Sequence, residues 1–462
     1  MRAALPAPRV LLAGTGSGCG KTTVTCAVLQ ALTDRGLRLG AFKCGPDYID
    51  PMFHSRIIGA KSGNLDLFFF RENTLRYLLA RNSRDRDVSV IEGVMGYYDG
   101  AGLASTLASS WETARAAEAP AVLVVPAKGA ALSILAVIQG FLDFQPDSRI
   151  RGVILNRCTA MTCQGLAEAI RERFGGRVKP LGFLPELPEC ALESRHLGLV
   201  TAAEVEGLRE KLHILARQAE ETIDMDGLLA LAESAPPLVF EPVALPRHEP
   251  VRIAVARDRA FCFYYEDSLE ALEEMGAELV PFSPLSDRTL PEDIHGLYLG
   301  GGYPELYARE LSRNESMRAA VREALEGGLP CIAECGGFMY LTQAIGEEPM
   351  AGFLPGKCRD NGRLTRFGYV TLRAKKDNLL CRAGEEIPAH EFHHWDAGDP
   401  GGDFTAGKLN GRRWDCVFAT DRLYAGYPHF HFYANPAFGE HFYQACIREK
   451  KRHAGNDEAH GY

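Results

Sequence analysis

Short apolar runs alternate with amphipathic segments through the first half of the chain. The runs have the length of strands, and the segments between them repeat apolar residues at helical spacing. This alternation predicts a parallel sheet with helices on both faces, whose ligands bind at the carboxyl ends of the strands. The expected strands lie near Val10–Ala13, Leu39–Phe42, Val88–Ile91, Ala121–Val125, Gly152–Leu155 and Leu181–Leu184, and helical patterns at Ala202–Glu221 and Leu228–Leu231 follow them.

A second series of strands and helices begins after a proline-rich stretch. Residues 236–250 contain five prolines and show little hydrophobic periodicity, which indicates an interdomain linker. The pattern therefore predicts two α/β domains, residues 1–235 and 251–450, followed by a charged tail at 451–462 that is expected to fray. The strands expected in the second domain lie near Val251–Ala256, Leu279–Phe282, Gly296–Leu299 and Cys331–Ala333.

Composition and charge narrow the functional classes. Of the 462 residues, 46% are hydrophobic and 24% are charged, and no apolar run approaches the roughly 20 residues that span a bilayer. Sixty acidic residues against 51 Lys and Arg leave a net charge of −9, which opposes general binding of nucleic acid. Because residues 1–8 lack the pattern of an export signal, we expect a cytoplasmic protein that binds neither membranes nor nucleic acid.

Cysteine usage points to a reducing compartment. The chain has 13 cysteines at scattered positions, an odd number that argues for reduced thiols rather than a disulfide scaffold. No C-x-x-C pair is present, so a structural zinc site is not expected.

A glycine-rich turn follows the first expected strand. Its sequence, GTGSGCGKTT at residues 14–23, leads into a helical pattern. Backbone N–H groups of such a turn bind phosphate oxygens, while Lys21 reaches the outer phosphates and Thr22 offers its hydroxyl to Mg²⁺. The first glycine is at position 14, one place earlier than the usual phosphate-loop spacing requires. We predict an ATP site formed by Gly16, Ser17, Gly18, Cys19, Gly20, Lys21, Thr22 and Thr23.

Acidic residues follow the second and third expected strands, where an ATP site requires oxygen ligands for Mg²⁺. Glu92 ends an apolar strand directly before a glycine, a position that directs its carboxylate toward the phosphates. It is therefore the expected metal ligand together with Thr22. The other acidic candidates for this site are Asp47, Asp50 and Asp99, and Lys43 is the candidate second cation near the phosphates.

A cysteine lies at a sharp turn between a strand and a helix in the second half. The segment PCIAECGGFMYL, residues 330–341, predicts a buried strand, a turn carrying Cys335 and a helix, which is the pattern of a nucleophile elbow. The helix N-terminus is expected to lower the pKa of Cys335, and the N–H of Gly336 to face a developing oxyanion. Gly301, in the stretch YLGGGYPE, is the second candidate oxyanion donor.

A thiolate nucleophile requires a nearby imidazole. The stretch GYPHFHF, residues 426–432, places two histidines on one side of an alternating strand, with His429 the first candidate and His431 the second. Residues 390–396, HEFHHWD, are also rich in histidine. Because such a cluster suits a domain contact or a substrate groove equally well, we assign it no catalytic role.

The combination of motifs resembles the cobyrinic acid a,c-diamide synthase family over roughly residues 9–446. The motifs KCGPDYIDP, NLDLFF, EGVMGYYDG, GVILNR, RHLGLV, YLGGGYPE, AECGGFMYL and HEFHH occur in the order of that family. The first half is similar to ATPases of the dethiobiotin synthetase type, which accounts for the shifted glycine, and the second half to class I glutamine amidotransferases. Class I domains commonly carry a glutamate at the position where this chain has His431. The cobyrinic branch of the class lacks that glutamate too, so the group that orients the imidazole of His429 is left open.

The resemblance implies amidation of the a and c acetate carboxylates of cobyrinic acid in cobalamin biosynthesis, with ATP and L-glutamine as cosubstrates. Cys335 would attack the glutamine carboxamide, and His429 would activate the thiol and protonate the departing ammonia. In the other domain Mg-ATP would convert a substrate carboxylate to an acyl phosphate that ammonia displaces. Arg195 and His196, in RHLGLV, are candidate groups for a polyanionic macrocycle.

Other functions stay open at this point. The same machinery would act on a related tetrapyrrole such as hydrogenobyrinic acid or nickel-sirohydrochlorin, and shared motifs do not separate these substrates. A switch ATPase of the partitioning type is disfavoured by Cys335, by His429 and by the absence of a lysine at Gly16. A cysteine hydrolase with an accessory nucleotide sensor is a further alternative. The sequence does not establish the oligomeric state, and a homodimer is one option.

Overall fold

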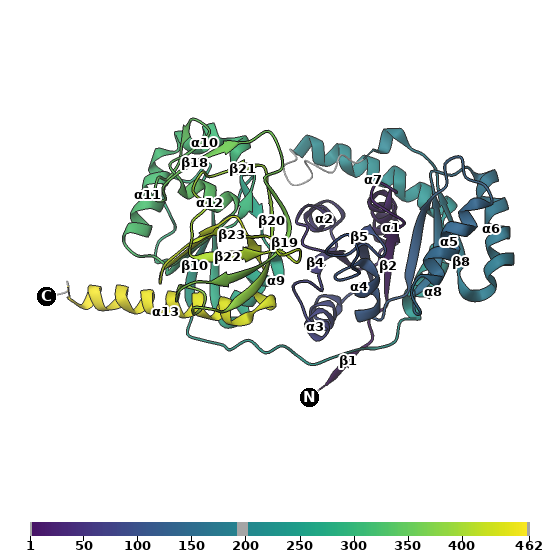
Figure 1. Ribbon diagram of the computed structural model, residues 1–462, viewed down its shortest axis with the longest axis horizontal. Coiled ribbons are helices and arrows are strands. Elements are labelled where there is room, and N and C mark those ends of the chain that lie inside the picture. Colours follow the sequence, from purple (N-terminus) through teal and green to yellow (C-terminus); the bar gives the residue numbers. More distant parts are fainter. Residues whose placement is uncertain (1, 192–201, 460–462) are drawn as a thin grey trace. The chain divides into compact units, whose positions relative to one another are not determined.

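The computed structural model describes residues 2–191 and 202–459. The chain divides into two compact units, Met1–Val243 and Ala244–Tyr462. Each unit has its own sheets and helices, many of which Figure 1 labels, and each is described by itself below. Arg195 and His196 lie outside the described residues. Within them, no helix has both the length and the apolar character that crossing a membrane requires.

The first unit is built around a seven-stranded sheet whose neighbouring strands all pair in parallel, in the order β4-β3-β5-β2-β6-β7-β8. The strands are β2 (Arg9–Gly14), β3 (Leu39–Cys44), β4 (Lys61–Leu65), β5 (Val88–Gly96), β6 (Ala121–Pro126), β7 (Ile150–Asn156) and β8 (Lys179–Leu184). The helices are α1 (Lys21–Asp34), α2 (Ile49–Phe53), α3 (Glu72–Ser83), α4 (Ser110–Ala116), α5 (Ser133–Asp143), α6 (Ala160–Phe174), α7 (Ala202–Thr222) and α8 (Met225–Glu233), with a π-helical turn at His54–Ile58.

This sheet confirms the predicted α/β fold, and all six strands expected in this half are present. The seventh, β4, has the sequence KSGNL, which lacks an apolar run and gave no strand signal. Two further short strands, which pair with each other, also gave no strand signal in the sequence. β1 (Ala3–Leu5) pairs antiparallel with β9 (Leu238–Phe240), so part of the expected linker is a strand of the first unit.

The position of the phosphate-binding turn follows from the burial of β2 and α1. Every residue of β2 is buried, and β2 lies between β5 and β6 at the centre of the sheet. On α1, Val24 and Val28 share one apolar core with Leu212 and Leu215 of α7. Because the strand and the helix are both held in this core, the turn between them has little freedom to move.

The second unit combines a mainly parallel sheet with an antiparallel one. The first has the order β12-β10-β13-β15-β25-β24, in which β24 alone pairs antiparallel, and the second has the order β23-β22-β19-β20-β26. The strands of these sheets are β10 (Val251–Ala256), β12 (Ala277–Phe282), β13 (Gly296–Leu299), β15 (Cys331–Glu334), β24 (Phe418–Ala419), β25 (Leu423–Gly426), β19 (Arg366–Ala374), β20 (Glu386–His393), β22 (Phe404–Gly407), β23 (Arg413–Cys416) and β26 (His429–Phe430).

Shorter strands and five helices complete this unit. The short strands are β11 (Phe261–Phe263), β14 (Gly301–Gly302), β16 (Ala344–Ile345), β17 (Glu348–Pro349), β18 (Lys357–Asp360) and β21 (Trp395–Asp396). The helices are α9 (Glu266–Met275), α10 (Ala308–Arg313), α11 (Glu315–Glu326), α12 (Gly336–Leu341) and α13 (Pro436–Ala459). The four strands predicted in this half correspond to β10, β12, β13 and β15.

The helix α13 passes residue 451, from which a fraying tail is expected, and continues to Ala459. Buried Glu449 pairs with Arg422 outside the helix and with Arg452 and His453 within it. Lys450 donates to the carbonyl of Pro250 at 2.7 Å. These contacts anchor the helix across the point where the apolar pattern stops.

Candidate active sites

The glycine-rich turn of the first unit joins β2 to α1, as predicted. Gly18 and Gly20 have positive φ angles of 74° and 88°, and Lys21 is the first residue of α1. Asn156, at the end of β7, donates from its side-chain nitrogen to the carbonyl of Cys19 at 2.8 Å. The turn is therefore fixed from a neighbouring strand as well as by its glycines, and it presents the helix N-terminus to an anion.

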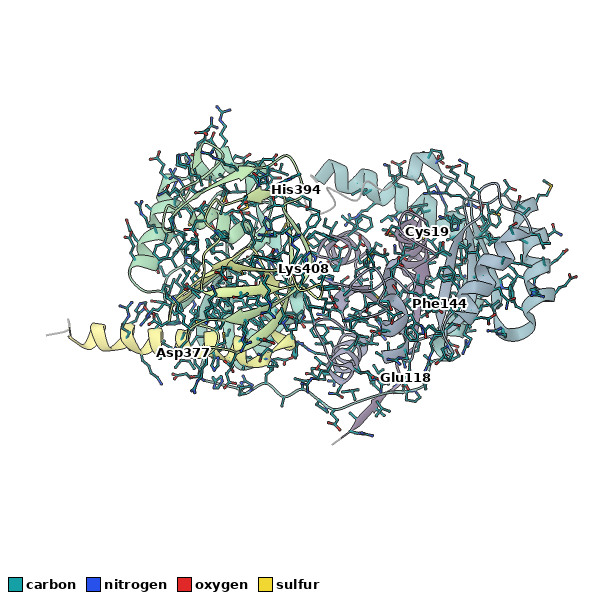
Figure 2. The ribbon with its side chains drawn as sticks, in the orientation of Figure 1. Cys19, Glu118, Phe144, Asp377, His394 and Lys408 are labelled. Carbon is teal, nitrogen blue, oxygen red and sulfur yellow. The ribbon has the colours of Figure 1, made fainter. Side chains whose placement is uncertain are left out.

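The structure explains the early glycine at position 14. A Cβ atom at Gly14 would lie 2.0 Å from the sulfur of Cys19, whereas one at Gly16 would meet nothing within 4 Å. Figure 2 labels Cys19 in the turn ahead of α1, and its side chain is buried. The sulfur thus fills the space where a side chain at residue 14 would be, which requires glycine there.

Glu92 and Thr22 meet at this turn. Glu92 is fully buried on β5, and the hydroxyl of Thr22 donates to its Oε1 at 2.6 Å. Burial alone would raise the pKa of Glu92, but Lys43, His54 and Thr22 together hold that pKa well below its usual range. The other carboxylate oxygen, Oε2, has no hydrogen-bond partner among the described residues.

Lys43 is a buried cation between two carboxylates. Its Nζ lies 2.9 Å from Glu92 Oε1 and 2.5 Å from Asp50 Oδ2. Burial alone would lower the pKa of Lys43, but the charges of Glu92, Asp50 and Asp47 raise it well above its ordinary value. Lys21, by contrast, has a lowered pKa because it is buried and faces the charge of Lys43. Two lysines therefore lie close enough to repel each other at the site where anionic phosphates are expected.

His54 is a residue of this cluster that the sequence analysis missed. It begins the π-helical turn after α2, is 1% exposed, and places Nε2 3.4 Å from Glu92 Oε2. Single π-helical turns occur frequently at functional sites. The local signal was the position of His54 four residues after Asp50, but a lone histidine near an aspartate has too many structural explanations to be selected from sequence.

Asp47 and Asp99 lie near the turn, and their hydrogen bonds go to backbone N–H groups rather than to the Glu92 cluster. Asp47 accepts a hydrogen bond from the N–H of Ile49 at 2.8 Å, and burial and the charge of Asp50 raise the pKa of Asp47 to about 6. Asp99 is exposed and accepts from the N–H of Gly96 at 2.7 Å. Of the predicted acidic residues, Asp50 and Glu92 are therefore buried, Asp47 is half-buried and Asp99 is exposed.

The second unit contains the predicted elbow. β15 ends at Glu334, Cys335 follows with φ 48° and ψ −101°, and α12 begins at Gly336. A positive φ is uncommon for a residue other than glycine, and such backbone strain clusters at functional sites. The N–H of Cys335 donates to the carbonyl of Gly426 at 2.8 Å, which ties the elbow to β25.

The expected lowering of the Cys335 pKa is wrong. Burial raises this pKa, and the charges of Glu305, Glu334 and Glu391 raise it further, while the N–H of Gly336 acts in the opposite direction. The helix that follows has only six residues, so its N-terminus offers little to offset desolvation. The thiol therefore needs a base to become a nucleophile.

His429, the first candidate for that base, lies beside the elbow. It forms β26 with Phe430 and is 3% exposed. Its Nδ1 lies 3.0 Å from Oε2 of Glu334, the residue immediately before Cys335. A Cβ atom added to Gly301 would lie 2.5 Å from Cε1 of the imidazole, so the ring packs directly on that glycine's backbone. The structure thus places His429 against Gly301 and against Glu334, the residue before Cys335.

The other histidines have different surroundings. His431, the second candidate base, caps a short helical turn by accepting from the N–H of Tyr433 at 3.1 Å. In the HEFHH stretch on β20, His390 lies opposite His429 in the strand register, and burial and His429 lower the pKa of His390 to about 3. His393 instead stacks on Tyr427 with ring centroids 3.7 Å apart. Only the His390 end of that stretch adjoins the candidate base.

Gly336, the other oxyanion candidate, is tightly enclosed. A Cβ atom there would lie 2.9 Å from Cδ of Pro304 and 3.1 Å from the backbone nitrogen of Gly302. The glycine-rich stretch after β13 therefore packs closely against the start of α12, where the N–H of Gly337 donates to the carbonyl of Gly300 at 2.9 Å.

Comparison with known proteins agrees with this division of the chain. Residues 10–200 match the CobQ/CobB/MinD/ParA nucleotide binding domain, and residues 252–437 match the CobB/CobQ-like glutamine amidotransferase domain. The cobyrinate a,c-diamide synthase of Listeria monocytogenes serotype 4b is 38% identical over 95% of this chain and 100% of that protein. The enzymes of the same name from Caldanaerobacter subterraneus and Thermoplasma volcanium are each 40% identical, over 94% and 96% of this chain and 98% of each relative.

The chain belongs to the cobyrinate a,c-diamide synthase family. As a member of this family it is an ATP-dependent carbon–nitrogen ligase that uses glutamine as its amide donor. The two domain matches fall on the two compact units, so the nucleotide turn and the elbow are assigned to different parts of the same enzyme.

The thiols of this synthase-family chain agree with the absence of a disulfide scaffold. All 13 cysteines are buried, all lie in the described ranges, and none of them is in a disulfide there. Within those same ranges, no three His, Cys, Asp or Glu side chains form a group that would hold a metal ion by themselves. A magnesium site of this synthase would therefore rely on a hydroxyl and on ligand oxygens in addition to a carboxylate.

The packing of Cys19 on Gly14 gives a first prediction. Gly14→Ala is expected to displace Cys19 and weaken ATP binding by at least about tenfold, because interatomic overlap in a packed turn forces the backbone to move. Adding Cys19→Ala should restore binding, since the Cβ atoms of residues 14 and 19 would be 3.6 Å apart. Titration calorimetry with ATP on both variants measures this, and a double variant as weak as Gly14→Ala would contradict it.

The raised pKa of Cys335 gives a second prediction. The rate of alkylation of Cys335 by iodoacetamide should rise about tenfold per pH unit from about pH 7 to about pH 9, because the thiol stays mostly protonated over that range. Peptide mass spectrometry follows Cys335 separately from the other cysteines. A rate that levels off by about pH 7 would instead indicate the depressed pKa that a reactive helix N-terminus produces.

Proposed function

We propose that this enzyme converts the a and c acetate carboxylates of cobyrinic acid to amides in cobalamin biosynthesis. The proposed substrate rests on the similarity to enzymes named cobyrinate a,c-diamide synthase, at 38–40% identity across almost the whole chain. The presence of both a phosphate-binding turn and a cysteine elbow supports the chemistry, because amidation of a carboxylate needs an activated acyl group and a source of ammonia.

Ammonia is proposed to come from the second unit. The thiol of Cys335 adds to the carboxamide carbon of glutamine while His429 takes its proton, and His429 returns that proton to the departing nitrogen. Ammonia leaves, and water hydrolyses the glutamyl thioester to glutamate and the free thiol. N–H groups near Gly301 and Gly336 are proposed to stabilise the oxyanion of each tetrahedral intermediate.

The first unit is proposed to activate the acceptor. A carboxylate oxygen of the macrocycle attacks the γ-phosphorus of ATP and displaces ADP, and ammonia then attacks the acyl carbon and displaces phosphate. Lys21, the N–H groups of residues 16–20 and Lys43 are proposed to stabilise the charge on the transferred group. Hydroxide and oxide are poor leaving groups, whereas phosphate is a good one, so ammonia forms the amide from the acyl phosphate and not from the free carboxylate.

The residues of this unit suit a magnesium ion. The hydroxyl of Thr22 and the carboxylate of Glu92 are 2.6 Å apart, and Oε2 of Glu92 is a buried acceptor whose nearest polar neighbour is Nε2 of His54, at 3.4 Å. Both are the hard oxygen ligands that Mg²⁺ prefers. When bound there, Mg²⁺ would neutralise charge on the phosphates of ATP. Asp47 and Asp99, which are more accessible, are proposed to contact the acceptor side of the site.

Separating the two nitrogen sources tests the role of Cys335. Cys335→Ala should lower glutamine-supported amidation of cobyrinic acid by at least about 10³-fold, because loss of a nucleophile removes covalent catalysis. Ammonia-supported amidation should persist, since the acceptor site is untouched. Mass spectrometry of the mono- and diamide products provides the readout with each donor, and equal loss with both donors would contradict the assignment.

Glu92→Gln tests the activation step. It should remove ATP-dependent amidation with either donor, by at least about 10²-fold, because the metal and Lys43 lose their carboxylate partner. Thermal unfolding reports whether the variant is folded, and glutamate release reports whether the glutamine site still works. Glu186→Gln, at an exposed carboxylate that pairs with Lys128 in the same unit, is the matched control and should retain activity. Full ammonia-supported activity in Glu92→Gln would refute its role.

The acceptor is tested by substituting the macrocycle. The enzyme should form the diamide of cobyrinic acid with a higher kcat/KM than the products of hydrogenobyrinic acid or nickel-sirohydrochlorin under identical conditions. A preference for either alternative would replace the proposed substrate while leaving the two-step chemistry intact.

A further inference from the structure

The base of the glutamine site lacks the orienting group expected from class I amidotransferases. That group is a glutamate two residues beyond the histidine, and residue 431 is histidine here. The structure also shows why residue 431 does not take over the function. His431 is fully buried, caps the turn at Phe432–Ala434 through the N–H of Tyr433, and has its ring centroid 4.9 Å from that of Tyr265.

A carboxylate nevertheless reaches the base from a different strand. Glu334 is the last residue of β15, is 2% exposed, and places Oε2 3.0 Å from Nδ1 of His429. This contact joins residues 95 positions apart in the chain. An imidazole nitrogen that contacts a carboxylate oxygen must carry the proton, so the other nitrogen, Nε2, becomes the proton acceptor.

The carboxylate is itself held in place. The hydroxyl of Tyr298, on the neighbouring strand β13, donates to Glu334 Oε1 at 3.1 Å. Burial raises the pKa of Glu334, and the bonds from His429 and Tyr298 counteract that rise. Each carboxylate oxygen thus has a donor, which fixes the plane of the group and the orientation of the ring that it contacts.

Glu334 and Cys335 are also consecutive residues. The backbone N–H of Cys335 is held by Gly426 on β25, and Glu334 pairs with Gly426 in the same register. A single strand end therefore fixes both the nucleophile and the group that contacts its base. The Cys335 thiol loses its proton at an unfavourable, buried position, so a carboxylate beside the imidazolium that results has a large effect on the barrier.

We propose that Glu334 is the positioning residue of the glutamine site and replaces, from the nucleophile's own strand, the glutamate that class I domains carry after the histidine. Glu334 selects the Nδ1-protonated tautomer of His429 and stabilises the imidazolium that forms when Cys335 is deprotonated. Tyr298 maintains the orientation of the carboxylate. This assignment rests on the proposed glutamine hydrolysis at Cys335 and names the group that supports it.

Three variants test the assignment on the full chain. Glu334→Gln, which keeps the shape and removes the charge, should lower kcat of glutamine hydrolysis by roughly 10²–10⁴-fold and change KM for glutamine by less than about threefold. Glu334→Asp keeps the charge and should recover part of the loss. Tyr298→Phe keeps the carboxylate and should cost less than about tenfold, since one of its two donors remains.

Matched controls separate positioning from stability. Glu449→Gln removes another buried carboxylate of the same unit, one that pairs with Arg422 and Arg452, and should lower thermal stability while kcat is unchanged. Ammonia-supported amidation should be the same in all four variants as in the unaltered enzyme. Nitrogen NMR of histidine-labelled enzyme should show that Glu334→Gln reduces the Nδ1-protonated tautomer of His429, a change that loss of stability alone does not produce.

The outcomes distinguish this inference from the proposed function. If Cys335→Ala abolishes glutamine hydrolysis while Glu334→Gln stays within about threefold of the unaltered kcat, Glu334 is not the positioning residue and the proposed function stands. A Glu334→Gln loss that appears in KM alone, or a Glu334→Asp variant no better than Glu334→Gln, also overturns it. If Cys335→Ala itself retains glutamine hydrolysis, the proposed function fails first.

Discussion

The cost of burying charge determines which partners both sites require. A lysine, an aspartate and a glutamate are buried together in the first unit, and a glutamate and a histidine in the second. None of these groups would remain charged alone in an apolar interior. Lys43 is stabilised by Glu92 and Asp50 at 2.9 and 2.5 Å, and Glu334 by donors on both of its oxygens. The geometry of each site follows from these pairings, because removing any partner leaves a buried charge uncompensated.

Sharp turns at the carboxyl ends of parallel strands place the phosphate-binding glycines and Cys335 next to these buried groups. β2 leads into the phosphate-binding turn, and β15 leads into the elbow. Both units therefore place their functional residues at a turn between a parallel strand and a helix, although the chemistry differs. The turns differ in how they are formed. Gly18 and Gly20 adopt positive φ angles at no steric cost, whereas Cys335 adopts φ 48° despite its side chain. The elbow therefore stores strain that the bond from Cys335 to Gly426 and the packing of α12 must balance.

Local signals were sufficient for most strands of the two parallel sheets and for the residues in the turns, and long-range pairing explains much of what was missed. Apolar runs predicted ten strands, and glycine, lysine and cysteine patterns selected Lys21 and Cys335, because those signals lie within a few residues of the chain. The antiparallel sheet around β19 and β20 depends on partners far apart in sequence, as does the contact of Glu334 with His429 across 95 positions. The predicted lowering of the Cys335 pKa was wrong for the same reason. A helix start is visible locally, but burial by other segments is not.

The elevated pKa of Cys335 and the carboxylate beside His429 belong to one arrangement. A thiol that is deprotonated without assistance would react with any electrophile that enters, whereas a buried thiol becomes nucleophilic only when the imidazole can take its proton. Side chains alternate across a strand, so Glu334 and Cys335 would normally point in opposite directions. The positive φ at Cys335 breaks this alternation at the strand end. That single distortion is what allows consecutive residues to take the roles proposed for them at one histidine, Cys335 as the nucleophile and Glu334 as the partner of Nδ1.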